Sequence, residues 1–377
     1  MTEQEFLNAD ILKTPITRQD EDFSNFTAYF LQTYLATLKS VDDDFKNKMY
    51  ERIPVIQELS YKLINSIEFY YLGNVSKAYQ SFCSGLALIR QYLWMDDTGV
   101  TVYHDEKTEN LLRENFFKMR TPGDKPFSKK EMFIRPFEER EYINTYRYSI
   151  PGLPCLYLSS NIYTAWNELN CPSINTLQVS RFILDKTLKR LRFGFNISFW
   201  MGASQSSEGI YSDKLYDYLT YFPLYAMCNV KVKNHCAVFK PEYIFPQFLM
   251  QWVKEEHRID MVEYASTKIN FNQTELSSFS YNFRNLAIPA QSSQEKGACT
   301  QLQTKIKLTE PISWQQLLSA YPKGNIPTKQ DNNMNAFRLM RDMIKLELIN
   351  SKPMMYKDTI FGLLEDFIID EIEPSFL

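Results

Sequence analysis

The stretch RYSIPGLPCLYLSSNIYTAWNEL, residues 147–169, carries the signals that decide the fold. Residues 149–152 predict a turn, because proline fixes φ and glycine permits a positive φ. The apolar run 153–158 then predicts a buried strand. One of the polar residues 159–161 can cap a helix that ends before Pro172. A turn, a strand and a helix in close succession indicate a domain of mixed secondary structure.

Similar signals continue on both sides of this stretch. Runs rich in β-branched and aromatic residues predict strands within RFILD, RLRFGFNISFW, VKNHCAVFKPEYIF, IDMVEYA, NLAIPA and TKIKLTEPI. Amphipathic patterns predict helices in SNIYTAWNEL and PQFLMQWVKEEH. We therefore assign the middle of the chain to the α+β class, with a mixed sheet and interleaved helices.

The two ends of the chain read as helical. Between residues 22 and 95 the pattern predicts three helices, the first with a buried stripe of Phe26, Tyr29, Phe30, Tyr34 and Leu38. After residue 311, further helices are predicted in ISWQQLLSAYP, MNAFRLMRDMIKLELI and TIFGLLEDFIIDEI. The expected organisation is an all-α N-terminal module at 1–112, an α+β domain at 113–310 and a helical C-terminal extension at 311–377.

Composition excludes several classes of protein. The chain has 377 residues, 44% of them hydrophobic, and a net charge of -3, which argues against a general nucleic-acid binder. Six scattered cysteines without a CxxC pair, with only three histidines, predict neither a metal site nor a disulfide framework. The polar start MTEQEFLNADILK is not a signal peptide, and the apolar runs are too short for a membrane span. We expect a cytoplasmic protein.

The familiar nucleotide and hydrolase motifs are missing from the sequence. None of the 11 glycines forms GxGxxG or GxxxxGK[ST], and neither GxSxG nor HExxH occurs. Any bound nucleotide would therefore be held by side chains such as arginine, which offers planar, bidentate donors to phosphate.

Four residues near the opening stretch could form a site. Arg147 precedes the turn, Tyr157 lies near the end of the strand, and Glu168 lies about two turns into the helix. Ser266 ends the later strand DMVEYAS. Each has a more ordinary interpretation when taken alone: a surface charge, a core aromatic, a solvated helix carboxylate and a residue that marks a strand end.

Taken together, these segments resemble the RES domain family. The resemblance is carried by FFKMR, RYSIPGLPCLYL, the helix with its glutamate, PQFLMQWV and DMVEYAS, and it covers roughly residues 115–310. RES domains are similar in fold to ADP-ribosyltransferases and act on NAD. Known examples are toxins of toxin–antitoxin pairs that hydrolyse or phosphorolyse NAD, and some transfer ADP-ribose to a protein.

The resemblance implies roles for individual residues. It matches the family's first arginine to Arg120 and its second to Arg147, and the tyrosine, glutamate and serine to Tyr157, Glu168 and Ser266. Glu168, Tyr157 and Arg120 would then be catalytic, and Arg147 and Ser266 would bind NAD. The segment FIRPF departs from the expected His-Ile-Pro-Phe, so a further arginine, at position 135, competes with Arg120 for the pyrophosphate.

The residue types suit this chemistry independently of the resemblance. Cleavage of the nicotinamide–ribose bond develops positive charge on the ribose, which a carboxylate such as Glu168 can stabilise, as carboxylates do in glycoside hydrolysis. Nicotinamide leaves from a pyridinium, so no strong general acid is needed. Tyr157 can stack on the nicotinamide or the ribose, and Ser266 can bind a ribose hydroxyl or the carboxamide.

Three functions remain open. The first is an NAD glycohydrolase or phosphorylase that acts as a toxin or defence effector, with NAD as substrate and no metal. The second is a protein ADP-ribosyltransferase with the same pocket. The third is an interaction module that binds a nucleotide without turnover. Expected partners are NAD, an antitoxin or immunity protein and a second copy of the chain, with neither nucleic acid nor membrane.

Overall fold

The computed structural model describes residues 1–19, 22–97, 114–204, 212–269, 282–321, 341–349 and 352–377. They form two compact units. Unit 1 comprises Met1–Trp94, Thr145–Ile150 and Phe195–Glu256, and unit 2 comprises Met95–Asn144, Pro151–Gly194 and His257–Leu377. This division differs from the expected boundaries at 112 and 310, because two later segments join the N-terminal helices and the C-terminal segment joins the sheet.

The regular elements described in unit 1 are helical. They are α1 (Glu3–Leu7), η1 (Asp10–Leu12), α2 (Phe23–Lys39), α3 (Asp43–Lys48), α4 (Arg52–Tyr71), α5 (Val75–Ile89), η2 (Arg90–Tyr92), α8 (Ile197–Ser204), α9 (Ser212–Cys228), η5 (Pro241–Tyr243) and α10 (Ile244–Glu255). The three helices predicted between residues 22 and 95 are confirmed as α2, α4 and α5, and the helix predicted in PQFLMQWVKEEH is confirmed as α10.

Two local predictions in unit 1 are wrong. Tyr29 is 73% exposed, whereas Phe26, Phe30, Tyr34 and Leu38 are buried. The buried stripe follows steps of four residues, and Tyr29 lies about 100° away from its neighbour Phe30 around the helix. The strand expected in 232–245 is also absent from these described residues, where η5 and the start of α10 are found instead. A proline opens η5, and proline cannot donate to a strand ladder.

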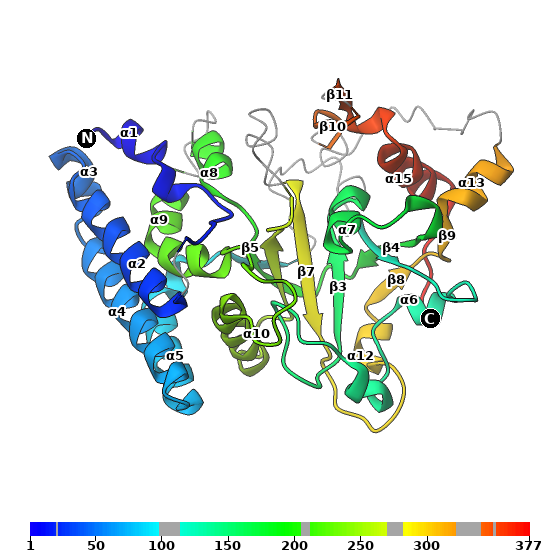
Figure 1. Cartoon of the computed structure of the whole chain (residues 1–377), viewed down its shortest axis with the longest axis horizontal. Helices are drawn as coiled ribbons and strands as arrows, with labels where there is room; N and C mark the ends of the chain where they lie inside the picture. The colour runs from blue at the N-terminus through cyan, green and yellow to red at the C-terminus, as the bar shows by residue number, and fades with distance from the viewer. Residues whose placement is uncertain (20–21, 98–113, 205–211, 270–281, 322–340, 350–351) are drawn as a thin grey trace. The chain divides into compact units, whose positions relative to one another are not determined.

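Unit 2 is built on a mixed sheet, as predicted (Figure 1). Its strands are β1 (Met95–Asp97), β2 (Phe116–Arg120), β3 (Cys155–Ser159), β4 (Gln178–Leu184), β5 (Lys189–Phe193), β6 (Met261–Ala265), β7 (Arg284–Pro289), β8 (Ile306–Leu308) and β9 (Ile312–Ser313). The described strands lie in the order β1-β5-β6-β7-β3-β2-β4-β8, with β9 beside β4. The β5–β6 pair is parallel, and β3, β6 and β7 pair antiparallel at the centre.

Helices of unit 2 lie beside this sheet, and each face carries its own hydrophobic core. They are α6 (Lys129–Met132), η3 (Phe137–Tyr142), α7 (Ile162–Glu168), η4 (Ile174–Thr176), α12 (Thr300–Gln303), α13 (Trp314–Ala320), η7 (Tyr356–Asp358) and α15 (Ile360–Glu371). Strand alternation sends Phe117 of β2 into the core that includes Ile162 of α7 and Phe361 of α15. Its neighbour Phe116 enters the opposite core with Leu156 and Leu158 of β3. The α+β class is confirmed.

The C-terminal segment matches its prediction only in part. The helices expected in ISWQQLLSAYP and TIFGLLEDFIIDEI are α13 and α15. The helix expected over 334–349 is wrong at its end, where β10 (Lys345–Ile349) pairs with β11 (Lys352–Met355). Residues 334–340 lie outside the described residues. The letters KLELI alternate in polarity, which suits a strand, but the helical pattern before them concealed this alternation.

Gly362 in the first turn of α15 has no room for a side chain. A Cβ at this position would lie 2.3 Å from the Tyr356 carbonyl oxygen and 2.7 Å from Lys357 Cα. Gly362→Ala should therefore lower the free energy of unfolding by roughly 1–3 kcal/mol, as overpacking does. Gly202 in α8 has no atom within 4 Å of such a Cβ, so Gly202→Ala is the control and should leave stability equal or higher. Urea unfolding measures this difference, and an equal fall in the unfolding free energy of both variants would contradict the expectation.

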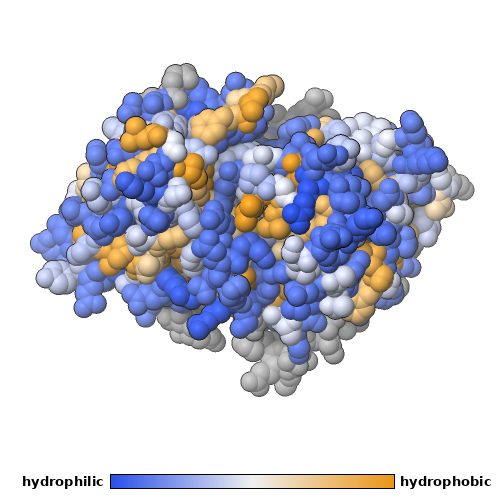
Figure 2. Space-filling view, turned by 90° about the horizontal axis from the view of Figure 1, so that it is seen from below, coloured by the Kyte–Doolittle hydropathy of each residue, from blue (hydrophilic) through white to orange (hydrophobic). Residues whose placement is uncertain are grey.

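None of the helices in the described part of the chain is long and apolar enough to cross a membrane. Figure 2 shows that hydrophilic residues dominate the face in view, with apolar ones in small groups between them.

Candidate functional site

The strand and helix of the opening stretch place Glu168 at a helix end. The expected strand is β3 and the expected helix is α7, whose N-cap is Asn161. The Asn161 side chain accepts a hydrogen bond of 2.8 Å from the Thr164 amide, which fixes where the helix begins. Seven residues later the helix ends at Glu168.

One carboxylate oxygen of Glu168 is held by two donors from later segments of the chain. The Ser266 hydroxyl, which follows β6, donates to Oε1 at 2.7 Å, and the Asn285 side chain of β7 donates to the same atom at 2.8 Å. The structure thus brings together two predicted site residues, Glu168 and Ser266. The Glu168 side chain keeps 30% of its surface exposed.

The second oxygen, Oε2, is engaged more weakly. Its closest cation in the described residues is the Lys268 ammonium at 4.0 Å. Lys268 is half-buried, and its Nζ donates to the Glu168 carbonyl oxygen at 2.5 Å and to the Asn170 side chain at 2.9 Å. Its amide also donates to the Ser266 hydroxyl at 3.3 Å. The arrangement holds Oε1 by hydrogen bonds and leaves Oε2 the less constrained oxygen of a carboxylate that solvent can reach.

Asn285 completes this cluster and was missed in the sequence. It lies directly across from Ser159 in the β3–β7 ladder, and the Ser159 hydroxyl donates to its Oδ1 at 2.6 Å. Because its oxygen accepts from Ser159, its amide group is turned toward Glu168. Asparagine is unfavourable in a strand, so its presence in the apolar strand NLAIPA was a sequence signal that could have identified Asn285. The sequence around Lys268 contains no comparable signal.

Tyr157 shares the sheet face of this cluster. It lies two residues before Ser159 in β3 and opposite Ala287 in β7, so strand alternation directs both side chains to one side. The ring is half-buried.

Arg120 and Arg135 lie elsewhere in unit 2. The Arg120 guanidinium donates to the Glu131 carbonyl oxygen at 2.6 Å and lies over the Phe127 ring at 3.9 Å. Since Phe117 pairs with Ser159, alternation along β2 places Arg120 on the opposite sheet face. Arg135 is bound to Glu139 at 2.6 Å. The structure therefore does not bring either arginine to the Glu168 carboxylate.

A lysine links these two arginines electrostatically. Burial lowers the pKa of Lys118 to about 7, with further lowering by the positive charges of Arg120 and Arg135. Its ammonium donates to the Phe133 carbonyl oxygen at 2.8 Å. The charges of the two arginines thus lie close enough to Lys118 to disfavour its protonated form.

Arg147 belongs to unit 1, in the segment Thr145–Ile150. It is buried, with its guanidinium over the ring of Tyr148 at 5.6 Å. Its convergence with Glu168 stays a prediction.

Behind the candidate site, the sheet carries a buried charge cluster, defined here as Glu114, Arg190, Arg192, Glu263 and Arg284. Glu114 accepts from Arg190 at 2.6 Å and from Arg284 at 2.5 Å, and Glu263 accepts from Arg190 at 3.0 Å. Arg284 precedes Asn285 in β7, so the two point to opposite faces of one strand. The charge cluster and the Glu168 site are thus joined through that strand.

Glu114 makes this cluster sensitive to acid. Burial alone would raise the pKa of Glu114, but Arg190, Arg284 and Arg192 outweigh burial and lower it to about 2. A carboxyl with a depressed folded-state pKa stabilises the fold above its unfolded pKa of about 4.3, and this is lost as the pH falls toward the folded value. We expect about 3 kcal/mol of the unfolding free energy to disappear between pH 6 and pH 2 through this group. In urea unfolding, Glu114→Gln should therefore lose less unfolding free energy between pH 6 and pH 2 than the unaltered chain does. An equal loss in both proteins would contradict the role given to Glu114.

In the described residues, no group of three or more His, Cys, Asp or Glu side chains could hold a metal ion.

Comparison with known proteins gives one informative relative. The chain is 30% identical over 320 residues to the protein named "Putative toxin YopC" of Bacillus subtilis (strain 168). The match spans 81% of this chain and 69% of that relative. The chain belongs to the YopC family. No family model matches the chain, and no solved structure does, so membership of the RES domain family is not shown.

Proposed function

We propose that this member of the YopC family is an enzymatic toxin that degrades NAD, with the Glu168 cluster as its catalytic centre. The observation that carries the proposal is the unequal environment of the two Glu168 oxygens. Ser266 and Asn285 hold Oε1, while Oε2 belongs to a partly exposed carboxylate whose nearest cation among the described residues is Lys268, at 4.0 Å. The name of the relative, a toxin, agrees with the proposed role.

In the proposed reaction, the bond between the nicotinamide nitrogen and ribose C1 breaks, and its electron pair leaves with nicotinamide. Positive charge develops at C1 and the ring oxygen, and Glu168 Oε2 stabilises it. Water then adds to C1 and loses a proton, giving ADP-ribose, or phosphate adds and gives the corresponding sugar phosphate. Preorganisation by Ser266 and Asn285 matters because Glu168 need not reorient as the charge forms.

The remaining predicted residues receive supporting roles in this proposal. Tyr157 would stack on the nicotinamide or ribose from the same sheet face. Arg147 keeps the pyrophosphate-binding role that the RES resemblance implies. Arg120 and Arg135 receive no role at this site, because Arg120 lies on the opposite sheet face and Arg135 is paired with Glu139. An ADP-ribosyltransferase-like arrangement of unit 2, as in RES domains, is part of the proposal and is compatible with its mixed sheet. The Ser266 hydroxyl donates to Glu168, so we assign it to orienting the carboxylate as well as to contacting NAD.

The test is nicotinamide release from NAD by the purified full-length chain, with and without inorganic phosphate. Release in water alone would identify a glycohydrolase, and release that requires phosphate would identify a phosphorylase. Radioactive label from the adenylate moiety of NAD that becomes fixed to protein would favour the ADP-ribosyltransferase. Binding of NAD by the folded chain without any release would overturn the proposal in favour of a binding module.

A further inference from the structure

The helix that carries Glu168 is too short to hold its own position. α7 has seven residues, about two turns, and isolated helices of this length are marginal in water. Glu168 is its last residue, so a tilt or fraying of the helix would move the carboxylate directly. The contacts that fix the start of α7 therefore bear on the geometry of the site.

The first three amides of α7 each have a partner outside the helix. Amides at a helix start lack intrahelical acceptors. The Ile162 amide donates to Glu365 Oε2 at 3.0 Å, and the Tyr163 amide donates to the Tyr356 hydroxyl at 3.3 Å. The third donates to the Asn161 side chain. Two of the three acceptors thus come from the C-terminal segment, about 200 residues away in sequence.

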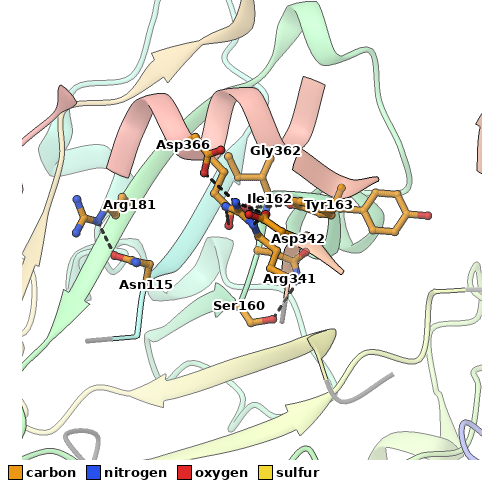
Figure 3. Close-up of polar contacts among 12 residues, drawn as sticks. Asn115, Ser160, Ile162, Tyr163, Arg181, Arg341, Asp342, Gly362 and Asp366 are labelled. Carbon is orange, nitrogen blue, oxygen red and sulfur yellow. Dashed lines mark hydrogen bonds and ion pairs between the residues drawn. The ribbon is translucent and has the colours of Figure 1, made fainter. Parts of the chain in front are cut away.

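Glu365 is itself held in place by a buried ion-pair group. The Tyr356 hydroxyl donates to its Oε2 at 2.8 Å, and Arg341 donates to its Oε1 at 2.9 Å. Arg341 also binds Asp366 at 2.8 Å (Figure 3). Arg341, Glu365 and Asp366 are all buried, so the carboxylate is constrained from both sides.

Aromatic contacts with α15 also hold α7 along its length. The Phe361 ring of α15 lies 5.2 Å from that of Tyr163 and 5.1 Å from that of Trp166, measured between centroids. Tyr163 and Trp166 are three residues apart, so α15 touches both turns of α7.

We propose that Glu365 of the C-terminal helix α15 is a positioning residue for Glu168. By capping the start of α7 it fixes the helix whose other end presents the Glu168 carboxylate. The inference deepens the proposed function and rests on it for its effect on NAD. On this basis the C-terminal helix is part of the catalytic apparatus of this chain.

The experiment compares two variants of the full-length chain, Glu365→Ala and Asp366→Ala. Each removes one carboxylate from Arg341, but only Glu365 accepts a hydrogen bond from α7. The first readout is hydrogen exchange of the amides of residues 164–169, which does not depend on activity. The second is kcat and KM for nicotinamide release from NAD. Glu365→Gln is the conservative variant, because its side-chain oxygen can still accept from the Ile162 amide.

For Glu365→Ala we expect exchange in 164–169 to rise about tenfold. We also expect kcat to fall about 10²-fold, with KM changed little, as when a catalytic group is displaced by about 1 Å. Asp366→Ala weakens the hold on Arg341 but leaves the hydrogen bond from Glu365 to α7 in place, so it should raise exchange in 164–169 and lower kcat distinctly less than Glu365→Ala does. Glu365→Gln should recover most of kcat. Equal exchange in the two alanine variants, or faster exchange with an unchanged kcat, would overturn the proposal. Absence of release from the unaltered chain would overturn the proposed function instead, while the exchange comparison would still decide whether Glu365 fixes α7.

Discussion

Glu168→Gln is expected to lower kcat for nicotinamide release from NAD by about 10³-fold, the upper range for removal of one preorganised electrostatic group. Glutamine retains an oxygen that can accept from Ser266 and Asn285, so the hydrogen bonds around Oε1 can persist. What disappears is the negative charge at Oε2 that would face the developing positive charge on the ribose. KM should change little, because the loss is confined to the transition state.

The measurement is steady-state nicotinamide release, beside an unfolding curve that shows whether the variant remains folded. Glu138→Gln is the matched control. It changes a carboxylate of the same unit that accepts a hydrogen bond from the Gly297 amide, away from the Glu168 cluster. A folded Glu168→Gln protein with a rate within a factor of about two of the unaltered chain would remove Glu168 from the catalytic role.

Glu263→Ala is expected to lower the free energy of unfolding by about 3–5 kcal/mol, the range for breaking a buried ion pair from one side. Glu263 is fully buried, and its carboxylate lies 3.0 Å from Arg190, 3.1 Å from Arg284 and 3.7 Å from Arg192. Its removal would take one of the two carboxylates of the charge cluster away from three buried arginines. Because Arg284 adjoins Asn285, activity should fall as well.

An exposed ion pair provides the comparison for this variant. Glu139 pairs with Arg135 at 2.6 Å, but the two side chains are 42% and 39% exposed. Solvent screening limits such a pair to about 1 kcal/mol or less, so Glu139→Ala should unfold almost like the unaltered chain. The unfolding free energies of both variants are measured in urea. A similar fall in Glu263→Ala and Glu139→Ala would contradict the expectation that the buried charge cluster stabilises the fold.

Local signals made part of this fold predictable. The Pro-Gly turn, the apolar run and the polar cap identified β3 and α7, and the cap proved to be Asn161. These elements are fixed by interactions between residues close in sequence, which a pattern can reveal. The same holds for α2, α4, α5 and α15.

Elements that depend on distant partners were predicted poorly. KLELI forms a hairpin strand because β11 pairs with it, although its upstream neighbours favour a helix pattern. The expected strand near Pro241 is replaced by η5 and the start of α10, and the exposure of Tyr29 depends on which helices surround α2. The boundaries of the two units also depend on contacts between distant segments, because residues 195–256 join helices that precede them by more than 100 positions.

The candidate site divides in a similar way. Glu168 and Ser266 were identified from their segments, and the structure joins them by one hydrogen bond. Asn285 and Lys268 were missed because their importance arises only when β6 and β7 lie beside the end of α7. Arg120 was expected at the same place, but the alternation of β2 directs it to the other face of the sheet.

The interrupted course of unit 1 along the chain affects the order in which the protein can fold during synthesis. α2 emerges from the ribosome early, yet the Tyr34 hydroxyl binds the Leu219 carbonyl oxygen, 185 residues later, at 2.7 Å. Unit 1 is therefore completed only when α10 has been translated, and the strands of unit 2 that follow come later still. A chain whose translation stops before residue 257 would contain Glu168 but neither Ser266 nor Asn285, the two donors that orient it.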